Sequence, residues 1–409
     1  MGDEMIFKKK YSNNLSLIIS SFFIASGLLF AMGNDHESGF KVFPSLQVVT
    51  PDSVGIVWKT FNPDVGVITI SLYPNMKDSV THTTSSNKLH KIKINGLSAN
   101  TRYYYQLTSD GEKTEINSFI TALQKGSRDP FRFIVYGDTR QGAWYEQIIM
   151  NYGDNDDHLS ICESIMSYAP DFLVLLGDLV KSGTSMSDIY NFFDVEKDLL
   201  ANYPVLTVYG NHEFRGNASK NNTKIDSYLI PAKGGAYDYY SYNYGNVHIL
   251  VINTGQLGEE GAITAPGTPQ YEFISSDLNT ASIDPDLDHI FVTMHCPLYS
   301  KGSFCDNKGL IQNLEPLFYT YGVRAVLYGH EHNYMHLRSN DGIEYFLTGG
   351  GGSPILDMVC FSTEAEVIEY HQVLNYLIIN VDGTNVDIEA RSVQGNGNST
   401  SAVLENISL

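Results

Sequence analysis

Residues 171–180 read DFLVLLGDLV, an apolar run that stops abruptly at a Gly-Asp pair. Four more segments share this pattern: an apolar, β-branched run leads to Gly or Met, and a polar residue follows directly. The five segments end at Asp138, Asp178, Asn211 with His212, His295, and His330 with His332. A buried strand that ends at a turn delivers its last polar side chain to one edge of a sheet. Carboxylate, amide and imidazole groups gathered there are the ligands that a pair of divalent cations requires.

The sequence around these segments alternates strand-like runs with helical stretches. Between residues 130 and 393, helices are predicted at His158–Tyr168 and Met186–Asn202. This alternation predicts an α/β domain whose ligands bind at the carboxyl ends of strands. The strand-like runs suffice for two stacked sheets with helices outside, a four-layer αββα domain. Residues 394–409 are rich in Asn, Ser and Gly and are expected to form a loosely ordered polar tail.

Residues 40–122 show short alternating strands separated by turn residues, which predicts a small all-β sandwich. Trp58 is expected in its core. Leu97, followed by Asn100 and the tyrosines at 103–105, is typical of a tyrosine corner, in which a tyrosine hydroxyl caps a backbone turn. The segment resembles a fibronectin type III domain. Two roles stay open for it, namely adhesion or substrate gating, and packing alone.

The length of 409 residues suggests more than one domain, and the formal net charge is −20. Such an acidic chain repels nucleic acid polymers and excludes them as partners. Small phosphate esters stay possible, because bound cations reverse the potential locally.

The first 33 residues have the features of an export signal. Lys8, Lys9 and Lys10 precede the apolar stretch Leu15–Met32, and a polar segment follows at once. A secreted or periplasmic protein is therefore expected, with an uncleaved membrane anchor as the alternative.

The chain contains four cysteines, Cys162, Cys296, Cys305 and Cys360. Cys296 and Cys305 bracket a short loop beside His295. Two alternatives are equally open: Cys296 and Cys305 form a disulfide, or both are buried free thiols.

The ordered motifs Gly-Asp, Gly-Asp, Gly-Asn-His-Glu, His and Gly-His-x-His resemble those of the calcineurin-like metallophosphoesterases. With a fibronectin-like segment in front, the chain looks most like the purple acid phosphatase branch. The resemblance implies a centre of two transition metal ions, iron, zinc or manganese, divalent or of mixed valence. Asp178 would bridge both ions. Asp138 and His332 would complete one ion's ligands, and Asn211, His295 and His330 the other's.

The family's chemistry assigns further roles. A water shared by the two cations loses a proton, and the resulting hydroxide attacks phosphorus in line. His212 is the candidate acid for the leaving alcohol, and Glu213 the candidate that orients its imidazole. Arg140 offers a fork suited to phosphate oxygens, although a surface or salt-bridged arginine is an equal alternative.

The sequence departs from the family pattern at several positions. Lys181 stands where purple acid phosphatases have a tyrosine ligand, so the enzyme is expected to be colourless, with Lys181 turned outward or in contact with substrate. Arg140 stands where the other large branch has a histidine ligand. His158 is either an additional ligand of the first metal or a helix-surface residue. Phe304 and Cys305 lie where relatives often carry a histidine pair, so substrate recognition differs.

Together these features predict an exported, metal-dependent phosphomonoesterase acting on small esters. A phosphodiesterase using the same site, acting on nucleotides or glycerophosphodiesters, is the first alternative. A metal-free adhesion protein on the same scaffold is the second.

Overall fold

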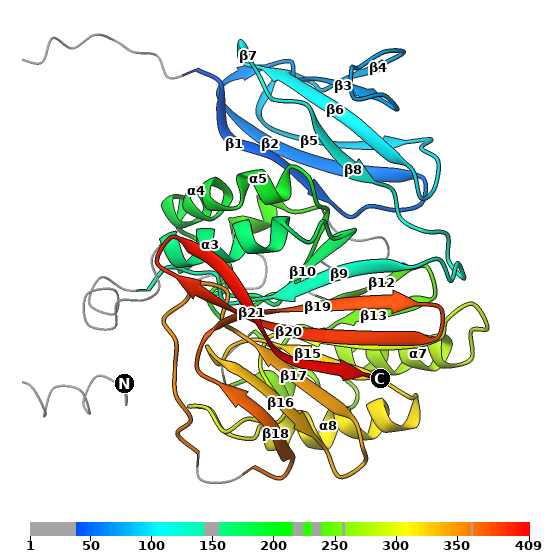
Figure 1. Ribbon diagram of the computed structural model, residues 1–409, viewed down its shortest axis with the longest axis vertical. Coiled ribbons are helices and arrows are strands. Elements are labelled where there is room, and N and C mark those ends of the chain that lie inside the picture. Colours follow the sequence, from blue (N-terminus) through cyan, green and yellow to red (C-terminus); the bar gives the residue numbers. More distant parts are fainter. Residues whose placement is uncertain (1–37, 143–154, 216–223, 231–238, 256–257, 361–362) are drawn as a thin grey trace, which may run out of the picture. The chain divides into compact units, whose positions relative to one another are not determined.

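The computed structural model describes residues 38–142, 155–215, 224–230, 239–255, 258–360 and 363–409 (Figure 1). The predicted export segment, residues 1–33, lies outside these ranges. Over the described ranges, no helix is long and apolar enough to cross a membrane.

The largest sheet in the described chain has the strand order β21-β20-β19-β9-β10-β11-β1-β2-β5. Its central strands β9, β10 and β11 are parallel, so their carboxyl ends meet at one edge. The bounds are β1 (Phe40–Gln47), β2 (Ser53–Asp64), β5 (Asn87–Asn95), β9 (Phe131–Tyr136), β10 (Phe172–Leu175), β11 (Val205–Thr207), β19 (Leu374–Asp382), β20 (Asn385–Gly395) and β21 (Asn398–Ser408).

A second sheet, ordered β12-β13-β14-β15-β17-β16-β18, carries the remaining motif strands. Strands β13, β14, β15 and β17 run parallel, again with their carboxyl ends at one edge. The bounds are β12 (Tyr240–Tyr244), β13 (Val247–Val251), β14 (His289–Met294), β15 (Ala325–Tyr328), β16 (Tyr334–Arg338), β17 (Glu344–Thr348) and β18 (Glu366–His371).

Helices cover the outer face of each sheet. Against the first sheet lie α3 (Asn155–Met166), α4 (Met186–Val195) and α5 (Lys197–Leu200), and against the second lie α7 (Pro269–Ser282) and α8 (Lys308–Thr320). Two short elements, η1 (Ile225–Tyr228) and α6 (Glu260–Ile263), lie in connections.

Alternation along each strand divides its side chains between layers, because successive residues point to opposite faces. In β9, Phe133 and Val135 face the space between the sheets, whereas Ile134 and Tyr136 face the helices. In β14, Phe291 faces inward and the residues beside it contact α7 and α8. The predicted α/β class and four-layer αββα arrangement are confirmed.

The N-terminal strands form a sandwich, and one of its two sheets is continuous with the nine-stranded sheet. Strand β1 pairs with β11 at Gln47 and Val205, so β1, β2 and β5 extend the nine-stranded sheet. The opposing sheet contains β3 (Val67–Ser71), β4 (Val80–Thr83), β6 (Arg102–Ser109), β7 (Glu112–Lys113) and β8 (Asn117–Ile120). The prediction of a sandwich holds, while its fibronectin type III identity stays a prediction.

Two residues named from the sequence occupy the expected places in this sandwich. Trp58 is fully buried, donates to Ser109 Oγ at 3.1 Å and stacks on His90. The hydroxyl of Tyr103 accepts the backbone N–H of Ser98 at 2.9 Å, which is the predicted tyrosine corner.

The C-terminal tail is not loosely ordered as expected. Residues Asn398–Ser408 form β21, which pairs with β20 in antiparallel register from Asn398 to Ser408. Asn396 and Gly397, both with positive φ, form the two-residue turn between β20 and β21. The Asn- and Gly-rich composition marked a hairpin rather than disorder.

Candidate metal centre

The five motifs end at the same edge of the two sheets. Asp138 follows β9, Asp178 follows β10 and Asn211 follows β11, while His295 follows β14 and His330 follows β15. All are buried, with exposed fractions of 6% or less. Five separate strands thus deliver polar side chains to one place, as strand–turn patterning predicts.

Three of these residues adopt a left-handed backbone conformation directly after a glycine. The φ angles are 60° at Asp138, 52° at Asp178 and 72° at His330. Non-glycine residues rarely adopt such angles, and they persist where the surroundings over-determine them, often at functional sites. The adjoining glycines are required by space as well, since a Cβ at Gly329 would lie 2.4 Å from Asp138 Oδ2.

Four potential ligand atoms converge at one point. His295 Nε2 lies 3.1 Å from Asn211 Oδ1, 3.3 Å from Asp178 Oδ1 and 3.1 Å from His330 Nδ1. Carboxylate, amide and imidazole donors at such spacing fit the ligand shell of one divalent transition metal ion.

A second pair lies at the same edge. His332 Nε2 is 3.5 Å from Asp138 Oδ1, and that oxygen is buried without a hydrogen-bond partner among the described residues. Buried carboxylate oxygens normally accept a hydrogen bond, so one that accepts none and faces an imidazole is suited to bind a cation. Asp138 Oδ2 is held by the backbone N–H of His330 at 2.8 Å.

Backbone carbonyls orient three of the imidazoles. The Nδ1 atoms of His295, His332 and His212 lie 2.7, 2.7 and 2.8 Å from the carbonyl oxygens of Leu176, Pro354 and Lys181. An Nδ1–H that donates to a carbonyl leaves Nε2 free for a metal or a substrate.

Without cations the site concentrates charge. Burial opposes protonation of His295, but the Asp178 carboxylate outweighs it and raises the pKa of His295 to about 9. Burial and the neighbouring His295 lower the pKa of His330 well below its usual value. The residues fit a binuclear centre.

His212 and Arg140 flank Asp178 on its other oxygen. His212 Nε2 lies 3.7 Å and Arg140 Nε 3.8 Å from Asp178 Oδ2. Burial lowers the pKa of His212 to about 3 despite the attraction of Asp178, so its imidazole is neutral near neutral pH. Arg140 Nε is buried and has no hydrogen-bond partner within the described chain, so it points toward the centre without being satisfied.

Glu213 does not orient His212, contrary to the sequence-based expectation. Its carboxylate accepts the backbone N–H groups of Asp178, Leu179 and Gly210 at 2.7–2.9 Å. It therefore fixes the turn that carries Asp178, and the Lys181 carbonyl holds the imidazole instead. Lys181 itself is exposed, in keeping with the outward orientation expected for it.

Known proteins are similar to this chain in sequence and in fold. The profile of the calcineurin-like phosphoesterase family matches residues 131–334. Purple acid phosphatase 21 of Arabidopsis thaliana is 27% identical over 259 residues, 61% of this chain and 53% of that protein. Tartrate-resistant acid phosphatase type 5 of Mus musculus is 28% identical over 217 residues, 47% of this chain and 64% of that protein. The chain belongs to the calcineurin-like phosphoesterases.

Solved structures agree on the fold. Purple acid phosphatase PPD1 from yellow lupin seeds matches with a TM-score of 0.71 at 20% identity, covering 90% of this chain and 74% of that one. The structure of PhoD matches with a TM-score of 0.65 at 11% identity, over 91% and 90%. The chain spans about half the length of Arabidopsis purple acid phosphatases 21 and 15, 53% and 54%. The sequence similarity to the Arabidopsis purple acid phosphatases, together with this shared fold, supports the purple acid phosphatase-like branch for this phosphoesterase.

A loop missed by sequence reasoning covers one side of this phosphoesterase centre. Glu331, between the two histidines of the last motif, accepts the backbone N–H groups of Ser303 at 2.9 Å and Phe304 at 2.8 Å. The loop is also tied by a disulfide between Cys305 and Cys360. The open pairing of Cys296 with Cys305 is thus wrong, and Cys296 is a buried free thiol. The spacing of 55 residues between the paired cysteines gave no signal.

The loop places an aromatic ring beside the centre. The Phe304 ring lies 4.1 Å from that of His330, and both line a cavity of about 520 Å³. Lys308 and Cys296 also line it. A surface-exposed aromatic ring next to a candidate metal ligand is suited to contact the organic part of a substrate.

Proposed function

We propose that this protein is an exported phosphomonoesterase that uses two transition metal ions to hydrolyse small phosphate esters. The observation that carries the proposal is the convergence of Asp178, Asn211, His295 and His330 within 3.3 Å contacts, with Asp138 and His332 at the same edge. Two divalent cations held there would lower the pKa of a water molecule and neutralise phosphoryl oxygens. Iron, zinc and manganese all suit these ligands.

The chain's own residues would do the remaining work. Asp178 would serve as the ligand shared by the two ions; one of its oxygens lies among the converging donors, and the other lies beside His212 and Arg140. The Arg140 guanidinium, whose Nε has no hydrogen-bond partner among the described residues and lies 3.8 Å from Asp178 Oδ2, would bind phosphate oxygens. His212 would give the leaving alcohol its proton from Nε2, and a bound phosphate dianion favours the protonated imidazole.

The experiment that tests monoesterase activity compares p-nitrophenyl phosphate with its bis ester. We expect faster cleavage of the monoester. Faster cleavage of the diester would establish the phosphodiesterase instead. Elemental analysis separates both from a metal-free adhesion protein, which would hold fewer than one transition metal per chain.

Export is supported by the disulfide as well as by the first 33 residues. A Cys305–Cys360 bond persists in oxidising compartments and is rare in the cytosol. We expect mass spectrometry of the protein from its native host to show either a mature start near residue 33 or, if the segment is an anchor, the intact chain in the membrane fraction. An intact chain in the cytosol would overturn the proposal of export.

A further inference from the structure

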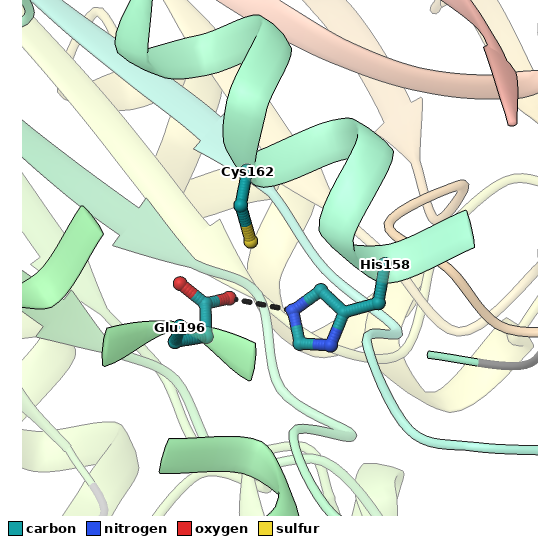
Figure 2. Close-up of side chains that lie close together, drawn as sticks. All are labelled: His158, Cys162 and Glu196. Carbon is teal, nitrogen blue, oxygen red and sulfur yellow. Dashed lines mark hydrogen bonds and ion pairs between the residues drawn. The ribbon is translucent and has the colours of Figure 1, made fainter. Parts of the chain in front are cut away.

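Three metal-binding side chains meet away from the binuclear edge. His158 and Cys162 lie four residues apart on α3, so they share one helix face, and Glu196 lies between α4 and α5. Figure 2 shows the imidazole, the thiol and the carboxylate pointing toward one another. One ligand atom from each lies within 4.8 Å of the other two, and the exposed fractions are 3%, 3% and 0%.

This geometry suits a tetrahedral ion. With bonds of about 2.0–2.3 Å, ligand atoms on one tetrahedron lie about 3–4 Å apart. His158 Nε2 is 2.8 Å from Glu196 Oε1, so a small widening of that hydrogen bond admits the ion. Tyr136 donates to both Glu196 oxygens at 3.0 and 2.9 Å and would hold the carboxylate in place from behind.

Charge balance favours a divalent cation. A divalent ion would displace the proton of the Cys162 thiol and, with that thiolate and the Glu196 carboxylate, form a neutral buried unit. The neutral imidazole then supplies its Nε2 lone pair.

We propose that His158, Cys162 and Glu196 bind a single zinc-type divalent ion, distinct from the binuclear centre. The ion joins α3 to the α4–α5 junction and, through Tyr136, to the strand β9 that leads into Asp138. A Cβ at Gly352 would lie 2.8 Å from His158 Cα, so the backbone of α3 also packs on the loop whose Ser353 N–H holds the Asp138 carbonyl. The role of this ion is therefore structural.

The test uses the full chain, stripped of metal with a chelator and reloaded with Co²⁺. A cobalt–thiolate bond produces a near-ultraviolet charge-transfer absorption that oxygen and nitrogen ligands do not produce. We expect the wild type to show this absorption and Cys162→Ser to lose it together with one equivalent of cobalt. Cys296→Ser is the matched control, because Cys296 is the other buried free thiol and lies beside His295. It should keep the absorption.

Two results would overturn the proposal. One is a cobalt-loaded wild type without the absorption, which would make the cluster a hydrogen-bond network only. The other is an absorption removed by Cys296→Ser and kept by Cys162→Ser, which would assign the thiolate to the binuclear edge. If Cys162→Ser does not fold, Glu196→Gln replaces it. That variant keeps the size of the side chain and its acceptor for Tyr136, and should likewise lose one cobalt equivalent.

Discussion

Asp178 is the residue on which the whole centre depends, because one oxygen faces the imidazole cluster and the other faces His212 and Arg140. Asp178→Ala should abolish both metal content and turnover, as measured by elemental analysis and ester hydrolysis. Lys181→Ala is the matched control three residues away, since its exposed side chain contacts none of the candidate ligands in the described chain. It should bind metal normally. An Asp178→Ala protein with two ions per chain would contradict the shared-ligand role.

A substitution of His212 tests proton transfer separately from metal binding, because His212 is not one of the six candidate metal ligands. Its ring is oriented by a backbone carbonyl and lies beside Asp178. His212→Ala should retain its ions yet lower the rate by about 10²–10⁴-fold. The loss should be smallest for esters with good leaving groups, which need little protonation. Measuring rates across phenyl phosphates of differing leaving-group pKa tests this role. Equal losses for all esters, or loss of metal, would show that the acid is misassigned.

Sequence alone predicted which side chains meet at one sheet edge, because they lie at the ends of apolar runs, whereas the role of these six residues as metal ligands stays a prediction. Sequence was insufficient where the structure depends on residues distant in the chain. The role of Glu213 was misread, since a neighbour in sequence was taken for a neighbour of the imidazole. Burial of His158 was missed because its partner Glu196 arises at a break between α4 and α5, where one continuous helix was predicted.

At the scale of an element, the loop carrying Phe304 should govern substrate selection. Its position depends on Glu331 and on the disulfide, neither of which contributes a candidate metal ligand. The double variant Cys305→Ser with Cys360→Ser should therefore raise KM for aryl phosphates with metal content unchanged, and lower stability by about 2–4 kcal/mol.

Phe304→Ala isolates the ring from the loop. It should raise KM for aryl phosphates more than for a small alkyl phosphate, without the loss in stability. Equal KM changes for both ester classes would show that the ring does not contact the leaving group.

At the scale of the whole chain, a cluster of charged side chains joins the two large sheets, and no local sequence pattern predicts it. His336 on β16 bonds Glu344 on β17 at 2.9 Å and Glu405 on β21 at 2.9 Å, and is 1% exposed. His336 thereby connects the second sheet to the last strand of the first. The contact between His336 and Glu405 holds residues 398–408 in place, and the amino-acid composition of this segment could not predict such a distant contact.

This cluster predicts a pH dependence of unfolding. Burial opposes the charged imidazole, yet Glu344 and Glu405 outweigh it and raise the pKa of His336, so its stabilisation is complete below the unfolded pKa and disappears as pH rises through the raised value. Burial also opposes the charged forms of Glu344 and Glu405, but their hydrogen bonds to His336 outweigh it, so the pKa values of both carboxyl groups are lowered. Their stabilisation is present above the usual glutamate pKa and disappears as pH falls through the lowered values.

The stabilisation from all three groups is therefore greatest between about pH 4.5 and 6.5, the unfolded pKa values of Glu and His. Urea unfolding of His336→Gln near pH 6 should show a loss of about 2 kcal/mol relative to wild type. The loss should shrink toward alkaline pH, where the wild-type imidazole is also neutral, and toward strongly acid pH, where the carboxylates are protonated. His82→Gln on β4, far from these strands in the sequence and in another sheet, should show no such profile. A loss that is constant with pH would mean that His336 contributes packing rather than charge.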